Sequence, residues 1–394
     1  MNTAIKHTEL GSIPGDWEIM AFGTLFTFTN GLNADKSAYG KGIPFINVLE
    51  PITYSHIYGP EIPGRVQISG ESAMAFLVKT NDIVLNRTSE TDSELGLAAV
   101  YLGDRKVVFG GFVIRGRPIS DALDPNYSGY ALRAKMIRTQ IVSMGQGAVR
   151  ANIGQQNLKQ VLVTVPPKHE QKAIAKALGD IDALIAALDS LIAKKRQIKQ
   201  ATMYQLLTGK TRLPGFSGKW ETKTLGEVAS IAKGTQLHSS ETNVEGDFPH
   251  FNGGMSASSY TDKANTPAET IAISEGGNSC GYVQFISEPF WCGGHCYAIV
   301  PSKVDKRFLY HALKGSQASI MGLRVGSGLP NVQKSALTAF KIRIPCDSSE
   351  QAAIATVLSD MDAELASLEV RRDKTHSLKQ GMMQELLTGK TRLF

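Results

Sequence analysis

The feature that most constrains this chain is an internal duplication. Residues 170–213 align without a gap with residues 350–393, at an offset of 180, and 23 of the 44 aligned positions are identical. A repeat of this kind means that one structural unit is written twice along the chain. Because 394 residues are too many for one ordinary core, we expect two related domains.

Upstream of this repeat the two halves agree only at scattered motifs. The corresponding pairs are Trp17 and Trp220, Gly23 and Gly226, PFIN (44–47) and PHFN (249–252), and FGGF (109–112) and CGGH (292–295). The offset falls from 203 at the tryptophans to 180 in the repeat, so the second globular part is 23 residues shorter. The globular parts have therefore diverged more than the segments that follow them.

The globular parts are predicted to mix strands and helices. Short runs rich in β-branched residues and bounded by turn residues predict strands. The clearest runs are DIVLN (82–86), KVVFGGFVI (106–114), VLVTV (161–165), TIAIS (270–274) and FKIRIP (340–345). Helices are expected at 131–144 and 308–321. The fold class is thus α+β, with each α+β domain followed by a long helix.

The two long helices carry apolar residues at alternating spacings of four and three, the a/d pattern of a coiled-coil seam. The predicted seam consists of Ile174, Leu178, Ile181, Ile185 and Leu188 in one helix and Ile354, Leu358, Met361, Leu365 and Leu368 in the other. A single helix with this stripe would more often pack on its own domain. Two long helices in one register favour an antiparallel pair, each about 36 residues or roughly 55 Å long. Such a pair would separate the two domains and give the chain pseudo-twofold symmetry.

The octapeptide LLTGKTRL stands at 206–213 and again at 386–393. Its GKT resembles the end of a phosphate-binding loop, but such a loop needs a glycine five positions earlier and opens a helix. Tyr204 and Gln384 occupy that position here, and the motif follows a helix. Gly209 and Gly389 are better interpreted as helix-terminating residues.

Composition and motifs exclude several classes of function. The formal charge of +6 and a pI near 9.0 give a weak indication of a polyanionic partner. The sequence shows no membrane span and no signal peptide, so a cytoplasmic location and no membrane partner are expected. Cys292 and Cys296, near His295 and Cys280, form only half of a zinc-binding pattern. No catalytic residue, metal or cofactor is predicted.

Two segments identify a family resemblance. VTVPPKHEQKAIAKALGDIDALI (163–185) and IRIPCDSSEQAAIATVLSDMDAEL (342–365) each join a short strand ending in Pro to Glu-Gln and a heptad helix. Together with the Trp-x5-Gly motifs and the LLTGKTRL ends, they resemble the specificity subunits of type I restriction–modification enzymes. The resemblance covers almost the whole chain, and the doubled architecture is more specific than any single motif.

The resemblance implies a division of labour. Residues 1–167 and 214–347 would be target recognition domains, each reading one half of a split, asymmetric target in double-stranded DNA. Residues 168–213 and 348–394 would be the conserved spacer helices. Two methyltransferase subunits, which methylate adenine, and two motor-nuclease restriction subunits would supply catalysis. The open alternatives are a coiled-coil adaptor that reads no DNA and a self-contained DNA-modifying enzyme.

Candidate DNA contacts lie in polar loops that follow strands. They are Asn47, Arg87, Thr88, Ser89 and Arg150 in the first domain, and Asn252, Ser274, Asn278, Trp291 and His295 in the second. Arg87 has the donors that match guanine, and Asn278 the amide that matches adenine. Ordinary surface turns explain several of these positions equally well. Asn47 and Asn252 favour a turn, and Trp291 and His295 also fit a packed strand end.

Overall fold

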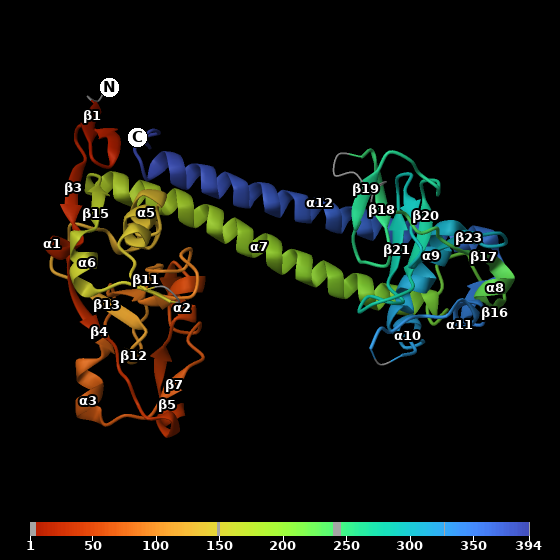
Figure 1. Ribbon diagram of the computed structural model, residues 1–394, viewed down its shortest axis with the longest axis horizontal. Coiled ribbons are helices and arrows are strands. Elements are labelled where there is room, and N and C mark those ends of the chain that lie inside the picture. The colour runs from red at the N-terminus through yellow and green to blue at the C-terminus, as the bar shows by residue number, and fades with distance from the viewer. Residues whose placement is uncertain (1–4, 148–149, 239–245, 327, 394) are drawn as a thin grey trace. The chain divides into compact units, whose positions relative to one another are not determined.

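The structure, a computed structural model, describes residues 5–147, 150–238, 246–326 and 328–393 (Figure 1). It divides into two compact units. Unit 1 comprises Met1–Ala187 together with Arg372–Phe394, and unit 2 comprises Leu188–Arg371. Each unit therefore contains one α+β region and a part of both long helices.

The α+β region of unit 1 is organised around a five-stranded sheet with the order β4-β13-β9-β11-β6 and a four-stranded sheet with the order β7-β5-β12-β8. Its strands are β1 (Ile5–Thr8), β2 (Gly11–Pro14), β3 (Glu18–Ala21), β4 (Phe26–Asn30), β5 (Tyr39–Ile46), β6 (His56–Ile57), β7 (Arg65–Val66), β8 (Leu77–Val78), β9 (Ile83–Asn86), β10 (Thr88–Ser89), β11 (Ala98–Tyr101), β12 (Val107–Phe109), β13 (Val113–Pro118), β14 (Ala151–Asn152) and β15 (Leu162–Val165). Its short helices are α1 (Phe22–Leu25), η1 (Lys36–Ala38), α2 (Leu49–Thr53), α3 (Gly70–Ala75), α4 (Pro125–Ala131), α5 (Lys135–Ser143) and α6 (Gln155–Gln160).

The α+β region of unit 2 has a four-stranded sheet with the order β17-β23-β20-β21, a three-stranded sheet with the order β19-β18-β22, and a β16–β24 pair. Its strands are β16 (Trp220–Thr224), β17 (Ala229–Lys233), β18 (Phe248–Phe251), β19 (Ser259–Thr261), β20 (Thr270–Ser274), β21 (Val283–Ile286), β22 (Trp291–Cys292), β23 (Cys296–Pro301) and β24 (Lys341–Pro345). Its short helices are α8 (Leu225–Val228), α9 (Lys306–Gly315), α10 (Gln317–Met321) and α11 (Lys334–Thr338).

The two regions repeat one arrangement. The order β4-β13-β9-β11 in unit 1 matches β17-β23-β20-β21 in unit 2, and the parallel pair β5–β12 matches the parallel pair β18–β22. Unit 1 adds α2, β6, β7, α3 and β8 between β5 and β9. This addition accounts for the greater length of the first globular part. Both regions combine sheets with short helices, so the predicted α+β fold is confirmed.

The structure corrects both predicted helices: 131–144 spans the last residue of α4, a turn and α5, and 308–321 is divided between α9 and α10. In unit 1 the chain turns between Ala131 and Lys135, where the Arg133 guanidinium donates to four backbone carbonyls at 2.8–3.0 Å. In unit 2 the break falls at Gly315 and Ser316. A single glycine or a satisfied buried turn is enough to override the apolar periodicity.

The long helices α7 (Lys168–Leu207) and α12 (Ser348–Leu386) pack together in antiparallel fashion within each unit, as predicted (Figure 1). In unit 1 Asp182 accepts from Lys379 at 2.5 Å. In unit 2 Lys195 pairs with Glu364 at 2.7 Å, and Lys199 pairs with Asp362. Later residues of α7 therefore pair with earlier residues of α12, as antiparallel helices require.

The apolar stripe of each long helix begins inside a domain core. Ile174 and Leu178 belong to a buried cluster with Trp17 and Tyr127 in unit 1. Ile354 and Leu358 belong to the main core of unit 2. Further along, Ile185, Leu188 and Leu365 are buried, whereas Ile181, Met361 and Leu368 are half-buried. One stripe thus anchors the helix to its α+β region and then continues along the helix pair.

LLTGKTRL ends each long helix, as predicted. Gly209 and Gly389 adopt left-handed φ angles of 68° and 71°, and their amides donate to the carbonyls of Leu206 and Leu386. A residue with a Cβ would be strained there, and at Gly389 it would also approach Pro14 to within 2.4 Å.

The arginine of each octapeptide binds a buried glutamate at the start of the other long helix. In unit 1 Arg392 donates to Glu170 at 2.5 and 2.8 Å, and the Trp17 indole donates to the same carboxylate at 2.9 Å. In unit 2 Arg212 donates to Glu350 at 2.5 and 2.6 Å. Both carboxylates have no exposed surface. We call these contacts the crossed arginine locks.

The glutamine after each of these glutamates ties the helix start to the α+β region. Gln171 donates to the Pro166 carbonyl at 2.8 Å and accepts from the Asp124 amide at 2.6 Å. Gln351 repeats this with the Pro345 carbonyl and the Asp305 amide, both at 2.8 Å. The duplicated Glu-Gln therefore fixes where each long helix leaves its domain.

We predict that Glu170→Ala destabilises unit 1 by about 2–3 kcal/mol, because the guanidinium and the indole both lose a buried acceptor. Lys176→Ala is the control on the same helix, since its pair with Asp180 is exposed on both sides and should contribute under about 1 kcal/mol. Denaturant unfolding of the two variants measures the difference. Equal effects of the two substitutions would contradict the lock.

A buried histidine links α9 to α12 in unit 2. His311 is 1% exposed, and its Nε2 lies 3.1 Å from the Ser359 hydroxyl. Burial lowers the pKa of His311 to about 4, although the nearby Asp362 carboxylate acts in the opposite direction. The neutral ring is therefore the form that the folded chain holds.

We predict that unit 2 loses stability as the pH falls from about 6.5, the pKa of an unfolded histidine, toward 4. The unfolded chain takes up the proton first, so the stabilisation is complete above this window and declines within it by about 3 kcal/mol. His311→Gln should flatten that part of the stability profile. His376→Gln, at an exposed position of α12, should leave the profile as it is.

Candidate nucleic-acid interface

The ends of several strands meet at one corner of each α+β region. In unit 1 the Arg87 amide donates to the Phe112 carbonyl at 2.8 Å, and the Gly110 amide donates to the Ile46 carbonyl, next to Asn47, at 2.9 Å. A Cβ at Gly111 would collide with Asn33. We call Asn33, Asn47, Arg87 and Phe112 corner 1.

Unit 2 builds the same corner with the same backbone bonds. The Glu275 amide donates to the His295 carbonyl at 2.9 Å, and the Gly293 amide donates to the Phe251 carbonyl, next to Asn252, at 2.9 Å. A Cβ at Gly294 would approach Gln236. Corner 2 therefore consists of Gln236, Asn252, Glu275 and His295, each equivalent to one member of corner 1.

The predicted contacts of unit 1 lie at or beside corner 1. Asn47 is exposed, and the Arg87 side chain is half-buried with its guanidinium 3.4 Å from the Gly111 carbonyl. Thr88 donates to the Asn152 side chain at 2.6 Å, across the β10–β14 pair. Ser89 is buried and donates to Glu94 at 3.0 Å. Hydroxyls used in this way hold the loop in place.

Arg150 lies on the next loop, in GQGAVR, of which residues 148 and 149 are outside the described residues. Its guanidinium donates to Glu90 at 2.6 and 3.0 Å, and both side chains are more than half exposed. An exposed pair of this kind contributes little stability, so the arginine can exchange its carboxylate partner for a phosphate at small cost.

The predicted contacts of unit 2 divide in a similar way. Asn252 accepts from the His295 amide at 3.0 Å, and Asn278 is exposed. Trp291 is half-buried, and its indole donates to the Thr235 carbonyl at 2.8 Å. Ser274 is buried, with its hydroxyl 3.4 Å from the Gly276 carbonyl. The His295 side chain is 62% exposed.

Glu275 is the most constrained charged group at corner 2. One of its oxygens accepts from Lys233 at 2.7 Å and from the Tyr297 hydroxyl at 2.9 Å. The other lies 3.6 Å from His295 Nδ1 and has no hydrogen-bond partner within the described part of the chain. Burial raises the pKa of Glu275, but its bonds to Lys233 and Tyr297 outweigh burial and hold the pKa below its usual value.

The cysteines of this region belong to the core. Cys292 and Cys296 are buried in a cluster with Ala272 and Phe290, whereas the neighbouring His295 side chain lies toward Glu275. No group of three or more His, Cys, Asp or Glu side chains suited to a metal ion occurs among the described residues.

Sequence reasoning named only some members of the two corners. Asn33, Phe112, Gln236 and Glu275 were not singled out. The aligned motifs FGGF and CGGH pointed to Phe112 and His295 as equivalent residues. Glu275 stood next to the predicted Ser274, but only the backbone pairing shows that it is the counterpart of Arg87.

Comparison with known proteins places the chain in a family. A family model described as "Type I restriction modification DNA specificity domain" matches residues 14–200 and again residues 217–374. The chain belongs to the specificity subunits of type I restriction–modification enzymes. Members of this family take part in DNA target recognition and are not themselves catalytic, so the expectation of a non-enzymatic subunit is confirmed.

Relatives match either nearly the whole chain or about half of it. A protein provisionally named the type I restriction enzyme MjaX specificity subunit, from Methanocaldococcus jannaschii, is 28% identical and covers 98% of this chain and 96% of its own. The Escherichia coli type I restriction enzyme EcoDI specificity subunit is 27% identical over 43% of this chain and 37% of its own. The solved S subunit from M. genitalium matches with a TM-score of 0.65 at 21% identity, over 98% of this chain and 99% of that one. This likeness supports the fold.

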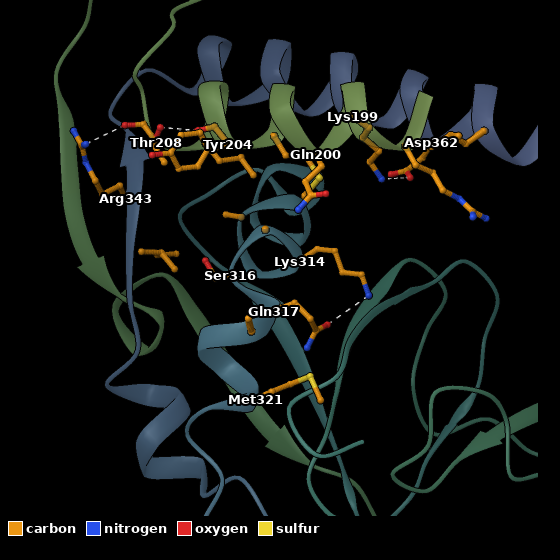
Figure 2. A pocket seen from close by; sticks show the side chains of 18 of the residues that line it. Lys199, Gln200, Tyr204, Thr208, Lys314, Ser316, Gln317, Met321, Arg343 and Asp362 are labelled. Carbon is orange, nitrogen blue, oxygen red and sulfur yellow. Dashed lines mark hydrogen bonds and ion pairs between the residues drawn. The ribbon is translucent and has the colours of Figure 1, made fainter. Parts of the chain in front are cut away.

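This specificity subunit also has a groove in unit 2, at the end of α7. The groove has a volume of about 1160 Å³ and lies against α9, α10 and β24. Figure 2 shows Lys314 and Gln317 pointing toward each other, apart from the α7 side chains Gln200, Tyr204 and Thr208, with Lys199 held by Asp362 at one end. Its charged lining is mostly basic, with Arg196, Lys199, Lys314, Lys341 and Arg343 against Asp362 and Glu369.

Unit 1 repeats this groove at the end of α12, against α5 and the turn that precedes it, with a volume of about 780 Å³. The residues that line it from the long helix include the counterparts, at the offset of 180, of those in unit 2. The equivalent pairs are Gln200 and Gln380, Met203 and Met383, Tyr204 and Gln384, Leu207 and Leu387, and Thr208 and Thr388. No described helix is both long and apolar enough to cross a membrane.

Proposed function

We propose that this specificity subunit reads an asymmetric, two-part target in double-stranded DNA, with one half-site for each α+β region. In this proposal residues 1–167 read half-site 1 and residues 214–347 read half-site 2. The observation that carries it is the contrast between the two corners. Their backbones form equivalent hydrogen bonds, while Arg87 and Phe112 in corner 1 are replaced by Glu275 and His295 in corner 2. Equivalent scaffolds with different chemistry suit two different short sequences.

The long helices would set the gap between the half-sites. Half-sites read from one side of B-DNA lie about 34–36 Å apart, or multiples of that distance. A 40-residue helix such as α7 has a length of about 60 Å, which is sufficient for a spacer of that order. The spacer segments in this proposal are 168–213 and 348–394.

The chain would direct partner subunits that perform the chemistry. We propose two methyltransferase subunits, with two restriction subunits added in the complete enzyme. One matching solved structure, with a TM-score of 0.58, concerns complex assembly and conformational transition of the type I R-M system. The duplicated grooves support a pair of equal partners, because a repeated surface binds the same partner twice. We propose that each groove receives one methyltransferase subunit.

Exchange of recognition regions tests the two-part target. Replacing residues 11–165 by the corresponding region of another specificity subunit should change half-site 1 and leave half-site 2 unchanged. Removing one heptad from each long helix, such as 185–191 and 369–375, should shorten the gap and leave the bases unchanged. The readout is the set of sequences that the reconstituted methyltransferase methylates. A change in both halves after the exchange, or in the bases after the deletion, would contradict the proposal.

Groove occupancy tests the partner arrangement. Gln200→Arg and Gln380→Arg each place a long charged side chain in one groove from an exposed position, so the fold should be retained. Each single variant should bind one methyltransferase subunit in place of two, and the double variant should bind none. Gln197→Arg is the matched control, because Gln197 is exposed on the same helix and does not line the groove. Mass measurement of the purified complexes reports the stoichiometry. If the double variant still bound two methyltransferase subunits, the grooves would be excluded as the binding sites.

A further inference from the structure

Two equivalent positions carry opposite chemistry on one backbone frame. Arg87 and Phe112 in corner 1 correspond to Glu275 and His295 in corner 2. The carbonyls of Arg87 and Glu275 also accept equivalent bonds, from Ile153 at 3.0 Å and from Val332 at 2.8 Å. A cation has therefore been exchanged for an anion, and an aromatic hydrocarbon for an imidazole, with no change in the path of the chain.

Packing does not explain the exchange of Phe112 for His295. Phe112 is 56% exposed and the His295 side chain is 62% exposed, so neither fills a core. A phenyl ring exposed to this degree contributes little to the stability of the fold. Side chains that diverge where the fold places no demand on them are candidates for binding.

The geometry of corner 2 defines what His295 can offer a ligand. Lys233 and Tyr297 saturate one oxygen of Glu275, and the unpartnered oxygen faces His295 Nδ1 at 3.6 Å. A carboxylate beside one ring nitrogen holds the proton on that nitrogen. The opposite nitrogen, Nε2, is then a hydrogen-bond acceptor on an exposed side chain. Arg87, at the position equivalent to Glu275, presents only donors.

We propose that these two pairs of residues determine base specificity, and that His295 Nε2, positioned by Glu275, accepts a hydrogen bond from a base's exocyclic amino group in half-site 2. Cytosine and adenine carry such a group in the major groove, whereas guanine presents acceptors there that suit Arg87. His295 is the residue that contacts the base, and Glu275 is the positioning residue. The inference rests on the proposed reading of half-site 2 by unit 2.

Base preference at one position of half-site 2 tests the assignment. His295→Ala should reduce discrimination at that position about tenfold in the reconstituted methyltransferase. The double variant Glu275→Arg with His295→Phe transplants the chemistry of corner 1 and should move the preference toward guanine. Half-site 1 should be unchanged in both, and serves as the internal control. Synthetic sites with purine in place of adenine, or 2-pyrimidinone in place of cytosine, lack the amino group and show which base is read.

Two controls separate this inference from simpler effects. Glu288→Arg makes the same charge change as Glu275→Arg at an exposed position of unit 2, and should strengthen DNA binding without changing the sequence. Thermal unfolding should show His295→Ala to be as stable as the natural chain, since the side chain lies at the surface. If both corner variants keep the natural base preference at that position of half-site 2, the inference is wrong while the two-part target stands. If exchange of residues 11–165 also fails to change half-site 1 while leaving half-site 2 unchanged, the proposed function is wrong.

Discussion

The structure depends on a pair of ionic contacts that cross between the two copies of the repeat. Glu170 and Glu350 are fully buried at the starts of the long helices, and each is neutralised by an arginine that follows the other long helix. A buried carboxylate without such a partner is strongly destabilising. The locks therefore require antiparallel helices, because only that direction brings the end of one helix to the start of the other. The repeated octapeptide is the part of the chain that meets this requirement.

The two copies of the fold are nearly identical in some segments and differ in others. The segments that make the locks, the glutamine ties and the helix ends are nearly identical in both copies, since each must satisfy buried polar groups. The corners keep their glycines and backbone bonds, yet Arg87 in one is replaced by Glu275 in the other, and the exposed Phe112 by the exposed His295. This combination suits the proposed function, in which two equal partners are bound and two different half-sites are read.

Much of the fold could be predicted from the sequence, and the reasons are physical. The apolar spacing of the long helices, the helix-ending glycines and the β-branched strands such as 270–274 all reflect local rules. The breaks within 131–144 and 308–321 could not be read from periodicity, because Arg133 and Gly315 act through tertiary contacts and a local turn. The sequence predicted only some residues of the two corners. Glu275 is the counterpart of Arg87 because of backbone bonds between segments that are distant in the sequence.

The division into units has a consequence for the order in which the protein is made. Unit 2 is one continuous stretch, Leu188–Arg371, whereas unit 1 needs Arg372–Phe394 to be complete. On the ribosome all of unit 2 is therefore synthesised before Arg392 can reach Glu170. The nascent chain carries its first α+β region with an unneutralised glutamate while the second region finishes folding. Synthesis begins with unit 1, but unit 2 is the first to possess all of its parts.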